Sequence, residues 1–177
     1  MNQVIIQYYK TNMGELVLGS YQNELCLCDW RYRKSRAAID KRIQDGLKAE
    51  YVEDTSPVIL SAIQQLEEYF KKERTSFDLP LLLIGSEFQK KVWNELLCIS
   101  YGKKISYMTL TKKLGDVKAI RAVASANGAN AISIIVPCHR VIASDGKLTG
   151  YAGGLPAKKK LLALESSSTE AEQLNLF

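Results

Sequence analysis

The chain has 177 residues, of which 46% are hydrophobic and 24% are charged, and its formal net charge at pH 7 is +5. This hydrophobic content excludes an intrinsically disordered chain, and only 11 glycines and 4 prolines exclude a collagen-like or low-complexity one. No apolar run approaches the roughly 18 residues that a membrane-spanning helix needs, which excludes an integral membrane protein.

The basic charge is concentrated in the second half of the chain. Residues 1–80 hold 11 Lys and Arg against 12 Asp and Glu, whereas residues 81–165 hold 13 against 5. Such a basic module either meets a polyanion such as nucleic acid or presents a solvated basic face. Charge alone leaves both interpretations open.

The N-terminal sequence lacks the basic start, apolar stretch and cleavage site of a secretory signal, so we expect a protein of the cytoplasm, nucleus or nucleoid. In that reducing compartment the four cysteines, whose spacing forms no framework, are expected to be free thiols. A zinc site is disfavoured, because the chain has one histidine and no paired CxxC motifs.

Residues 1–30 alternate apolar and polar side chains and predict a strand meander in the segments VIIQYYK, GELVLGSY and ELCLCDW. Cys26 and Cys28 would share one strand face as packing residues. Residues 31–55 are charged and irregular, and no regular element is predicted there.

A helix is predicted to begin at Pro57, with Ser56 as its N-cap. Its apolar stripe consists of Ile59, Ile63, Leu66 and Phe70. Strands followed by one helix make a small α/β unit.

The segment 75–85 is interpreted as a connector with an apolar patch, and it precedes the change of charge. We therefore expect a first domain over 1–80, a second over 81–165 and a flexible tail over 166–177. Ser86 to Gln89 form a capping box in front of the next helix. The apolar face of that helix is predicted to consist of Phe88, Val92, Trp93, Leu96 and Leu97, with Cys98 ending the helix in the core.

Two short helices separated by a glycine are predicted next. Ser106 caps the first, which carries Leu110 and Leu114, and Gly115 ends it. Asp116 caps the second, VKAIRAVASANG, so the pair has a helix-turn-helix pattern.

Small residues fill the second of these helices, at Ala119, Ala122, Ala124, Ser125 and Ala126. They allow its backbone to approach a partner closely. That partner is either nucleic acid, which Lys118 and Arg121 would favour, or another helix in the core. Small residues alone do not separate the two.

The apolar run AISIIVP, residues 131–137, predicts a buried extended segment that ends at a proline. Cys138, His139 and Arg140 follow directly. A thiolate is the reactive form of cysteine, and a buried thiol needs a base or a positive charge to form it. The Cys-His dipeptide alone nevertheless favours structural packing, since adjacent side chains of a strand point to opposite faces.

The longer string IIVPCHRVIASDGKLTGYAGGLPAKKKLLALE, residues 134–165, closely resembles the active-site segment of the O6-alkylguanine-DNA alkyltransferases, the suicidal DNA-repair methyltransferases. The similarity continues upstream through YGKKISYMTL and VKAIRAVASANGAN and so covers residues 86–165. It implies a ribonuclease H-like α/β domain, built from the strand meander and helix, followed by a mostly α winged helix-turn-helix domain.

The resemblance implies a nucleophile, a base and an orienting carboxylate. By position, Cys138 is the alkyl acceptor, His139 deprotonates it through a bound water, and Glu165 orients the imidazole. Asn130 matches the residue that supports the loop before the active site. Tyr107 matches the tyrosine that rotates the target phosphate and protonates the departing guanine.

Arg121 matches the finger that fills the space of the extruded nucleotide, with its helix in the minor groove of double-stranded DNA. Further DNA contacts are expected from Ser106, Lys118, Ala122, Ala126 and Arg140, and the alkyl pocket is expected to include Pro137, Tyr151, Ala152 and Gly153. Some relatives have a serine in place of Ala152, so the balance between methyl and bulkier alkyl groups is open.

The implied function is irreversible, stoichiometric transfer of an alkyl group from O6-alkylguanine, or O4-alkylthymine, to Cys138, by a monomer without cofactor or metal. One alternative is a non-catalytic lesion sensor or DNA-binding regulator with the same fold, but such relatives replace the acceptor cysteine. A thiol hydrolase is a third interpretation, which leaves the basic module without a role.

The last five residues, QLNLF, resemble the pentapeptide by which many bacterial replication and repair proteins bind the sliding clamp. Gln173, Leu174, Leu176 and Phe177 would make this contact, and Asn175 departs from the usual serine or aspartate. The alternative is that these apolar residues fold back onto the protein's own surface.

Overall fold

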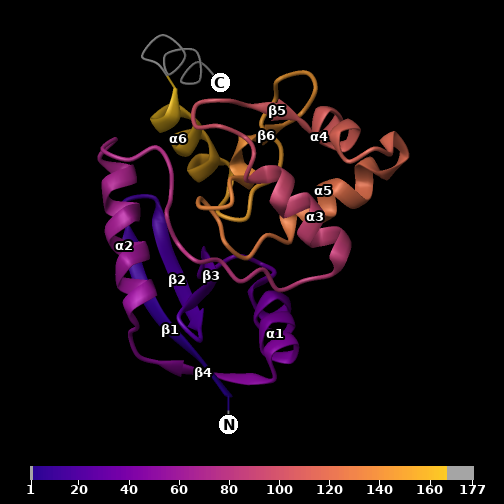
Figure 1. Ribbon diagram of the computed structural model, residues 1–177. Helices are drawn as coiled ribbons and strands as arrows, with labels where there is room; N and C mark the ends of the chain where they lie inside the picture. The colour runs from indigo at the N-terminus through magenta and orange to yellow at the C-terminus, as the bar shows by residue number, and fades with distance from the viewer. Residues whose placement is uncertain (1, 167–177) are drawn as a thin grey trace. The chain divides into compact units, whose positions relative to one another are not determined.

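The structure is a computed structural model that describes residues 2–166 (Figure 1). Two compact units divide the chain, Met1–Ser86 and Glu87–Phe177. This division follows directly after the connector 75–85, in which the sequence places the boundary. Within the described part of the chain, no helix combines the length and apolar character needed to cross a bilayer.

The predicted strand meander is confirmed as β1 (Asn2–Thr11), β2 (Gly14–Tyr21) and β3 (Glu24–Trp30), which pair antiparallel in sequence order. Gln22 and Asn23, with positive φ values of 49° and 62°, make the tight turn between β2 and β3. Cys26 and Cys28 are buried, as packing residues should be.

Residues 31–55 are not irregular, and the prediction is wrong there. They form α1 (Arg36–Leu47) and β4 (Ala49–Glu53), and β4 pairs in parallel with β1. Only Ile39 and Ile43 of α1 are buried, so its apolar periodicity is too weak to be seen in the sequence. The strand depends on pairing with β1, which lies more than 40 positions away in the chain (Val4 with Tyr51).

The predicted helix from Pro57 is confirmed as α2 (Pro57–Phe70), and the Ser56 hydroxyl accepts a hydrogen bond from the Ile59 amide at 3.3 Å. The buried stripe of α2 consists of Val58, Ile59, Ala62, Gln65, Leu66 and Tyr69. Ile63 and Phe70, predicted in the stripe, are half-buried at its edges. The sheet, in the order β3-β2-β1-β4, lies between α1 and α2 (Figure 1).

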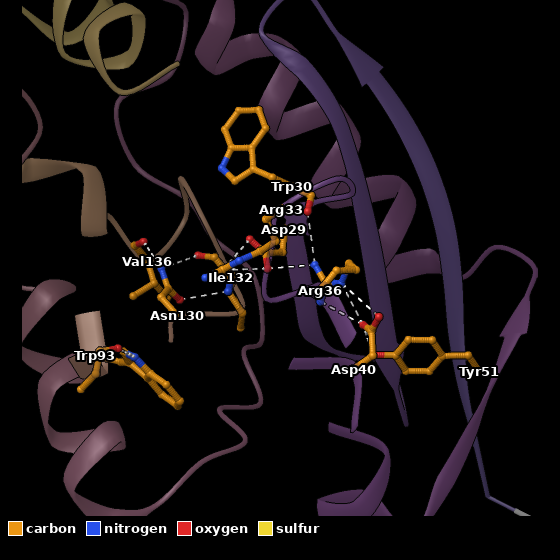
Figure 2. Close-up of polar contacts among 11 residues, drawn as sticks. Asp29, Trp30, Arg33, Arg36, Asp40, Tyr51, Trp93, Asn130, Ile132 and Val136 are labelled. Atoms are coloured by element: carbon orange, nitrogen blue, oxygen red, sulfur yellow. Dashed lines mark hydrogen bonds and ion pairs between the residues drawn. The ribbon is translucent and has the colours of Figure 1, made fainter. Parts of the chain in front are cut away.

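A buried carboxylate ties the segment after β3 to the sheet (Figure 2). Asp29 is fully buried and pairs with Arg33 at 3.0 Å and with Arg36 at 2.9 Å. Arg36 also binds Asp40, which accepts a hydrogen bond from the Tyr51 hydroxyl. A buried charge persists only when it is paired, so this cluster orders a segment that has almost no apolar core of its own.

The second unit contains α3 (Glu87–Leu96), α4 (Tyr107–Lys113), α5 (Ile120–Gly128) and α6 (Leu155–Glu165), and a short parallel pair, β5 (Ile105–Ser106) with β6 (Val141–Ile142). Helix α3 buries Val92, Trp93 and Leu96, and the Trp93 indole donates to the carbonyl of Ala126 at 2.8 Å. The predicted face is too wide, because Phe88 and Leu97 are exposed. Cys98 is also exposed and is not the core residue predicted.

The predicted pair of helices with a glycine turn is present. Ser106 accepts from the Thr109 amide at 3.0 Å and caps α4, and Gly115 follows α4 with φ +93°. Asp116 accepts from the Lys118 amide at 2.9 Å and caps one turn of 3-10 helix, Val117–Ala119, which continues into α5. Hydrogen bonds accepted by Ser106 and Asp116 therefore fix where the two helices of this pair begin.

Candidate active site

Cys138 follows a buried loop and begins one turn of 3-10 helix, Cys138–Arg140. The predicted extended segment over 131–137 is wrong in conformation, although its burial is correct. Hydrogen bonds join the Ile135 amide to Ser133 and the Val136 amide to Ile132, and Ile134 has φ +71°. The apolar run signalled burial, but turns rather than a strand satisfy its backbone.

Asn130 holds this loop closed (Figure 2). Its Nδ2 donates to the carbonyl oxygen of Val136 at 2.8 Å, and its Oδ1 accepts from the Ile132 amide at 2.9 Å. Asn130 is itself buried, so both bonds lie away from solvent. The loop-supporting position expected for Asn130 agrees with these bonds.

His139 and Glu165 form a buried pair, with 2.8 Å between Nε2 and Oε1. Because Cys138 and His139 lie in a 3-10 turn, the opposite-face argument for strand neighbours does not apply to them. The sequence thus brings the nucleophile and base candidates next to each other at the end of the loop. The carboxylate arrives from the last residue of α6.

Arg140 binds the same carboxylate, that of Glu165. Its Nε donates to Oε2 of Glu165 and its Nη2 to Oε1, both at 2.9 Å, while Nη1 donates to the carbonyl of Ile99 at 2.5 Å. Burial raises the pKa of Glu165, but His139 and Arg140 outweigh burial and lower that pKa to about 2. Glu165 is therefore ionised at neutral pH and accepts hydrogen bonds only.

This assigns the tautomer of His139. Since Glu165 only accepts, Nε2 must carry the hydrogen, and Nδ1 carries the lone pair. Nδ1 is buried and has no hydrogen-bond partner among the described residues. Burial lowers the pKa of His139 against the opposing effect of Glu165, so the ring is a neutral base at neutral pH.

Tyr107 lies at the start of α4, close to the cysteine. Burial raises the pKa of its hydroxyl, and the charge of Cys138 raises it as well, while side-chain hydrogen bonds with Thr149 and Asn127 lower it. The Tyr151 ring meets the His139 ring edge to face, with 6.5 Å between centroids. Of the other pocket candidates, Pro137 is buried and Ala152 and Gly153 are half-buried.

The exposed face of α5 carries the small residues and the arginine. Arg121, Ala122, Ala124 and Ser125 are exposed, as is Lys118 just before the helix. Of the two partners that the small residues allow, a core helix is therefore excluded for these positions, and an external partner remains. Ser106, at the start of α4, is half-buried.

Two residues expected on the DNA-binding surface lie elsewhere. Ala126 is 3% exposed and faces α3, because α5 turns its Val123 and Ala126 side inward. Arg140 is 7% exposed, and the ionised Glu165 holds its guanidinium inside the protein. Both expectations are corrected by the burial of these side chains.

Lys158 is a site residue that the sequence analysis did not identify. It is fully buried, and its Nζ donates to the carbonyl of Val141 at 2.7 Å and to that of Thr149 at 3.0 Å. In the run of three lysines from 158 to 160, helical spacing places only the first on the face of Leu161, Leu162 and Glu165. This helical periodicity is the feature of the sequence from which the burial of Lys158 could have been predicted.

No group of three or more His, Cys, Asp and Glu side chains within residues 2–166 could hold a metal ion. The described side chains of the site offer a thiol, a neutral imidazole on the next residue, a phenol and a buried ammonium. Such a set can form a thiolate and can protonate a leaving group.

Comparisons with known proteins match both units. The ribonuclease-like domain of 6-O-methylguanine DNA methyltransferase matches residues 4–83, and the DNA-binding domain of the same family matches residues 87–167. A methylated-DNA–protein-cysteine methyltransferase of Mycolicibacterium paratuberculosis is 53% identical over 116 residues, which are 66% of this chain and 70% of the relative. The Mycobacterium leprae protein of the same name is 42% identical over 86% of this chain and 87% of its own.

A solved structure, that of Mycobacterium tuberculosis OGT in complex with DNA, is similar throughout. It is 38% identical, with a TM-score of 0.78, and the match covers 92% of each chain. At this identity and coverage the similarity extends to the sequence as well as to the fold.

Proposed function

Since the chain belongs to the 6-O-methylguanine DNA methyltransferase family, we propose that Cys138 is the residue that accepts the alkyl group. The activity is repair of DNA by direct reversal, in which the protein transfers the alkyl group from the DNA to its own cysteine. The observation that carries the assignment to Cys138 is its position beside a buried, neutral His139 that is bonded to the ionised Glu165.

The reaction proceeds in line at the alkyl carbon. His139 takes the thiol proton at Nδ1 through a water, and the Cys138 sulfur forms a bond to the alkyl carbon. The bond from that carbon to O6 breaks, and its electron pair passes to guanine. Tyr107 donates a proton to this developing anion. A thioether is stable at neutral pH, so each chain reacts once, and O4-alkylthymine would react by the same steps.

The alkylated base must leave the duplex before it can react, at a cost of a few kcal/mol. We assign Arg121 to the space that the base vacates, with Lys118 and Ala122 on the same exposed side against the minor groove. Binding to DNA itself is a property of the family domain that residues 87–167 match.

The direct test is the mass of the intact protein after incubation with duplex DNA containing O6-methylguanine, followed by peptide mapping. We expect one added methyl group per chain, located on Cys138, and restored guanine in the DNA. Lesion-selective binding without a change of mass would instead support a sensor.

Arg121→Ala is expected to slow repair of a well-paired lesion by roughly tenfold or more, and to slow repair in single-stranded DNA much less, because only the duplex must be opened. Single-turnover rates on the two substrates measure the difference. Arg121→Lys, which keeps the charge but fills less space, is the matched variant. Equal losses on both substrates would remove the finger role.

We also propose that the C-terminal QLNLF docks on a bacterial sliding clamp. These residues lie outside the described ones, and the proposal rests on the motif, which follows the polar stretch SSSTEAE. A chain truncated after Ser168 should lose affinity for purified clamp, as should Phe177→Ala, whereas Glu170→Ala should not. Equal clamp affinity of the intact and truncated proteins would exclude the interaction.

A further inference from the structure

The turn that follows α3 meets the last turn of α6 within the second unit. The Lys103 amide donates to the carbonyl oxygen of Ser100 at 3.0 Å, which closes a turn over residues 100–103. Gly102 has φ +76°, a value that the third position of a type II turn requires and that favours glycine. The dipeptide Tyr101-Gly102 is therefore held in place by its own turn, and the reaction proposed above gives this turn no role.

Tyr101 and Gly102 both meet the carbonyl end of α6. The Tyr101 hydroxyl donates to the carbonyl oxygen of Leu164 at 3.2 Å. A Cβ atom at Gly102 would lie 2.9 Å from the carbonyl oxygen of Glu165, so this close approach requires glycine. The last four carbonyl groups of a helix have no partner within the helix, so the Tyr101 hydroxyl supplies one that α6 itself cannot.

The ring of Tyr101 also reaches the arginine that binds Glu165. The guanidinium carbon of Arg140 lies 5.8 Å from the centroid of that ring, within the range of a cation–π contact. Arg140 donates two hydrogen bonds to the Glu165 carboxylate and one to the carbonyl oxygen of Ile99, two residues before Tyr101. One short segment therefore contacts both the helix end that carries Glu165 and the guanidinium that binds its carboxylate.

These contacts act on a carboxylate whose place in its helix is unfavourable. Glu165 is the last residue of α6, and the helix dipole puts partial negative charge at that end. The hydrogen of the Tyr101 hydroxyl offsets part of this charge at Leu164. Burial and the charge of Glu165 raise the pKa of Tyr101, so the hydroxyl keeps its hydrogen at neutral pH. Tyr101 therefore remains a hydrogen-bond donor to the end of α6.

We propose that Tyr101 is a positioning residue for alkyl transfer, because it holds the Glu165 carboxylate within hydrogen-bonding distance of His139. The inference rests on the proposed function and adds to it a residue that acts through Glu165. The Tyr101 hydroxyl fixes the backbone at the end of α6, and its ring lies beside the guanidinium of Arg140. The carboxylate held in this way keeps the hydrogen of His139 on Nε2.

A purely structural role of Tyr101 would give a different pattern. If Tyr101 only stabilised the second unit, its loss would lower the free energy of unfolding and leave the folded site unchanged. If it positions Glu165, its loss must also weaken the hydrogen bond of His139 in the folded protein. His139 is the only histidine in the chain, so its ring signals are assigned without ambiguity.

The test combines nuclear magnetic resonance of isotopically labelled histidine with single-turnover transfer from O6-methylguanine DNA. In the parent protein, Nε2 of His139 should carry a hydrogen that is protected from exchange with water. In Tyr101→Phe, which keeps the ring and removes the hydroxyl, this hydrogen should exchange faster, and transfer should slow by about two- to tenfold. Tyr101→Leu, which removes the ring as well, should show larger changes in both.

Tyr32→Phe is the matched control, because Tyr32 is 77% exposed and belongs to the first unit. Its His139 signals and its transfer rate should equal those of the parent. Unchanged His139 signals in every Tyr101 variant that folds would overturn the proposal, whatever the transfer rates. Changed signals with a parental rate would overturn it too, because the position of Glu165 would then not limit transfer.

Gly102→Ala tests the end of α6 without altering Tyr101. The added Cβ meets the carbonyl oxygen of Glu165, and it should displace the carboxylate and speed exchange of the Nε2 hydrogen of His139. Gly146→Ala is the control for backbone strain, since Gly146 has φ +83° but nothing lies within 4 Å of its added Cβ. Its His139 signals should match those of the parent.

A folded Gly102→Ala protein with parental His139 signals would show that the end of α6 does not position the carboxylate, and so would overturn the proposal. The histidine signals are measured without DNA. Failure of this inference is therefore distinguishable from failure of Cys138 to accept an alkyl group, which would leave the parent protein itself without transfer.

Discussion

Cys138→Ser is expected to abolish alkyl transfer and to leave DNA affinity nearly unchanged. Serine has almost the same volume as cysteine, but its hydroxyl ionises far less readily and is a weak nucleophile. The affinity should persist because contacts to phosphates supply most of it, and Cys138 is a buried residue that is not exposed for such contacts. The measurements are the intact mass after incubation with O6-methylguanine DNA and a binding titration at fixed salt.

Cys98→Ser is the control for this experiment, because Cys98 is the exposed cysteine and is remote in sequence from the active-site turn. It should accept one methyl group on Cys138 as the parent does. Loss of DNA binding in Cys138→Ser would show that this cysteine supports the structure. A methyl group on any other cysteine of the Cys138→Ser variant would contradict the assignment of Cys138 as the acceptor.

Glu165→Ala is expected to have the largest effect on stability and also to abolish repair. It removes the partner of both His139 and Arg140. Arg140, which is 7% exposed, keeps only the Ile99 carbonyl as a hydrogen-bond acceptor and the Tyr101 ring 5.8 Å away. Breaking one side of a buried pair typically costs about 3–5 kcal/mol. Urea unfolding followed by tryptophan fluorescence gives the free energy, and single-turnover transfer gives the activity.

Glu165→Gln separates the two effects. The amide keeps an oxygen to accept from His139 but no charge, so the tautomer of His139 is no longer enforced. Stability should recover in part, whereas transfer should remain slow. If Glu165→Gln transferred the alkyl group at the parental rate, the orienting role of the carboxylate would be excluded.

The same pair determines how stability responds to acid. The folded pKa of Glu165, about 2, lies below its ordinary value of 4.5, so the unfolded chain binds the proton more readily. The stabilisation is therefore complete above about pH 4.5 and is lost as the pH falls towards 2. Glu165→Gln should lack this part of the acid sensitivity when unfolding free energies are compared across that range.

Capping and periodicity are local signals, and they determined several elements of this protein from the sequence. The meander β1–β3, the start of α2 at Ser56, and the helix pair capped by Ser106 and Asp116 all follow from them. The similarity of the string around Cys138 to a known family likewise required only the sequence. The capping and strand signals lie within a few residues of the element that they predict, and the family resemblance lies in one continuous stretch of the chain, residues 86–165.

The elements missed in the sequence depend on partners far away in the chain. The strand β4 exists because β1 pairs with it, and α1 is ordered by the ion pairs of Asp29 with Arg33 and Arg36, the second of which begins the helix. The loop 131–137 turns instead of extending, because Asn130 and short-range hydrogen bonds satisfy its backbone. Hydrophobicity reports burial, but it does not report which backbone group finds which partner.

The charged residues of the active site show most clearly what the sequence determines and what only the tertiary structure determines. The sequence by itself supplied the thiol, the imidazole and the carboxylate, and it located basic residues near them. Only the tertiary structure decided that Arg140 binds Glu165 inside the protein, and that Lys158, unlike Lys160, is buried. The physical reason is that a charged side chain is stable in the interior only beside a specific partner, and the fold determines which partner it meets.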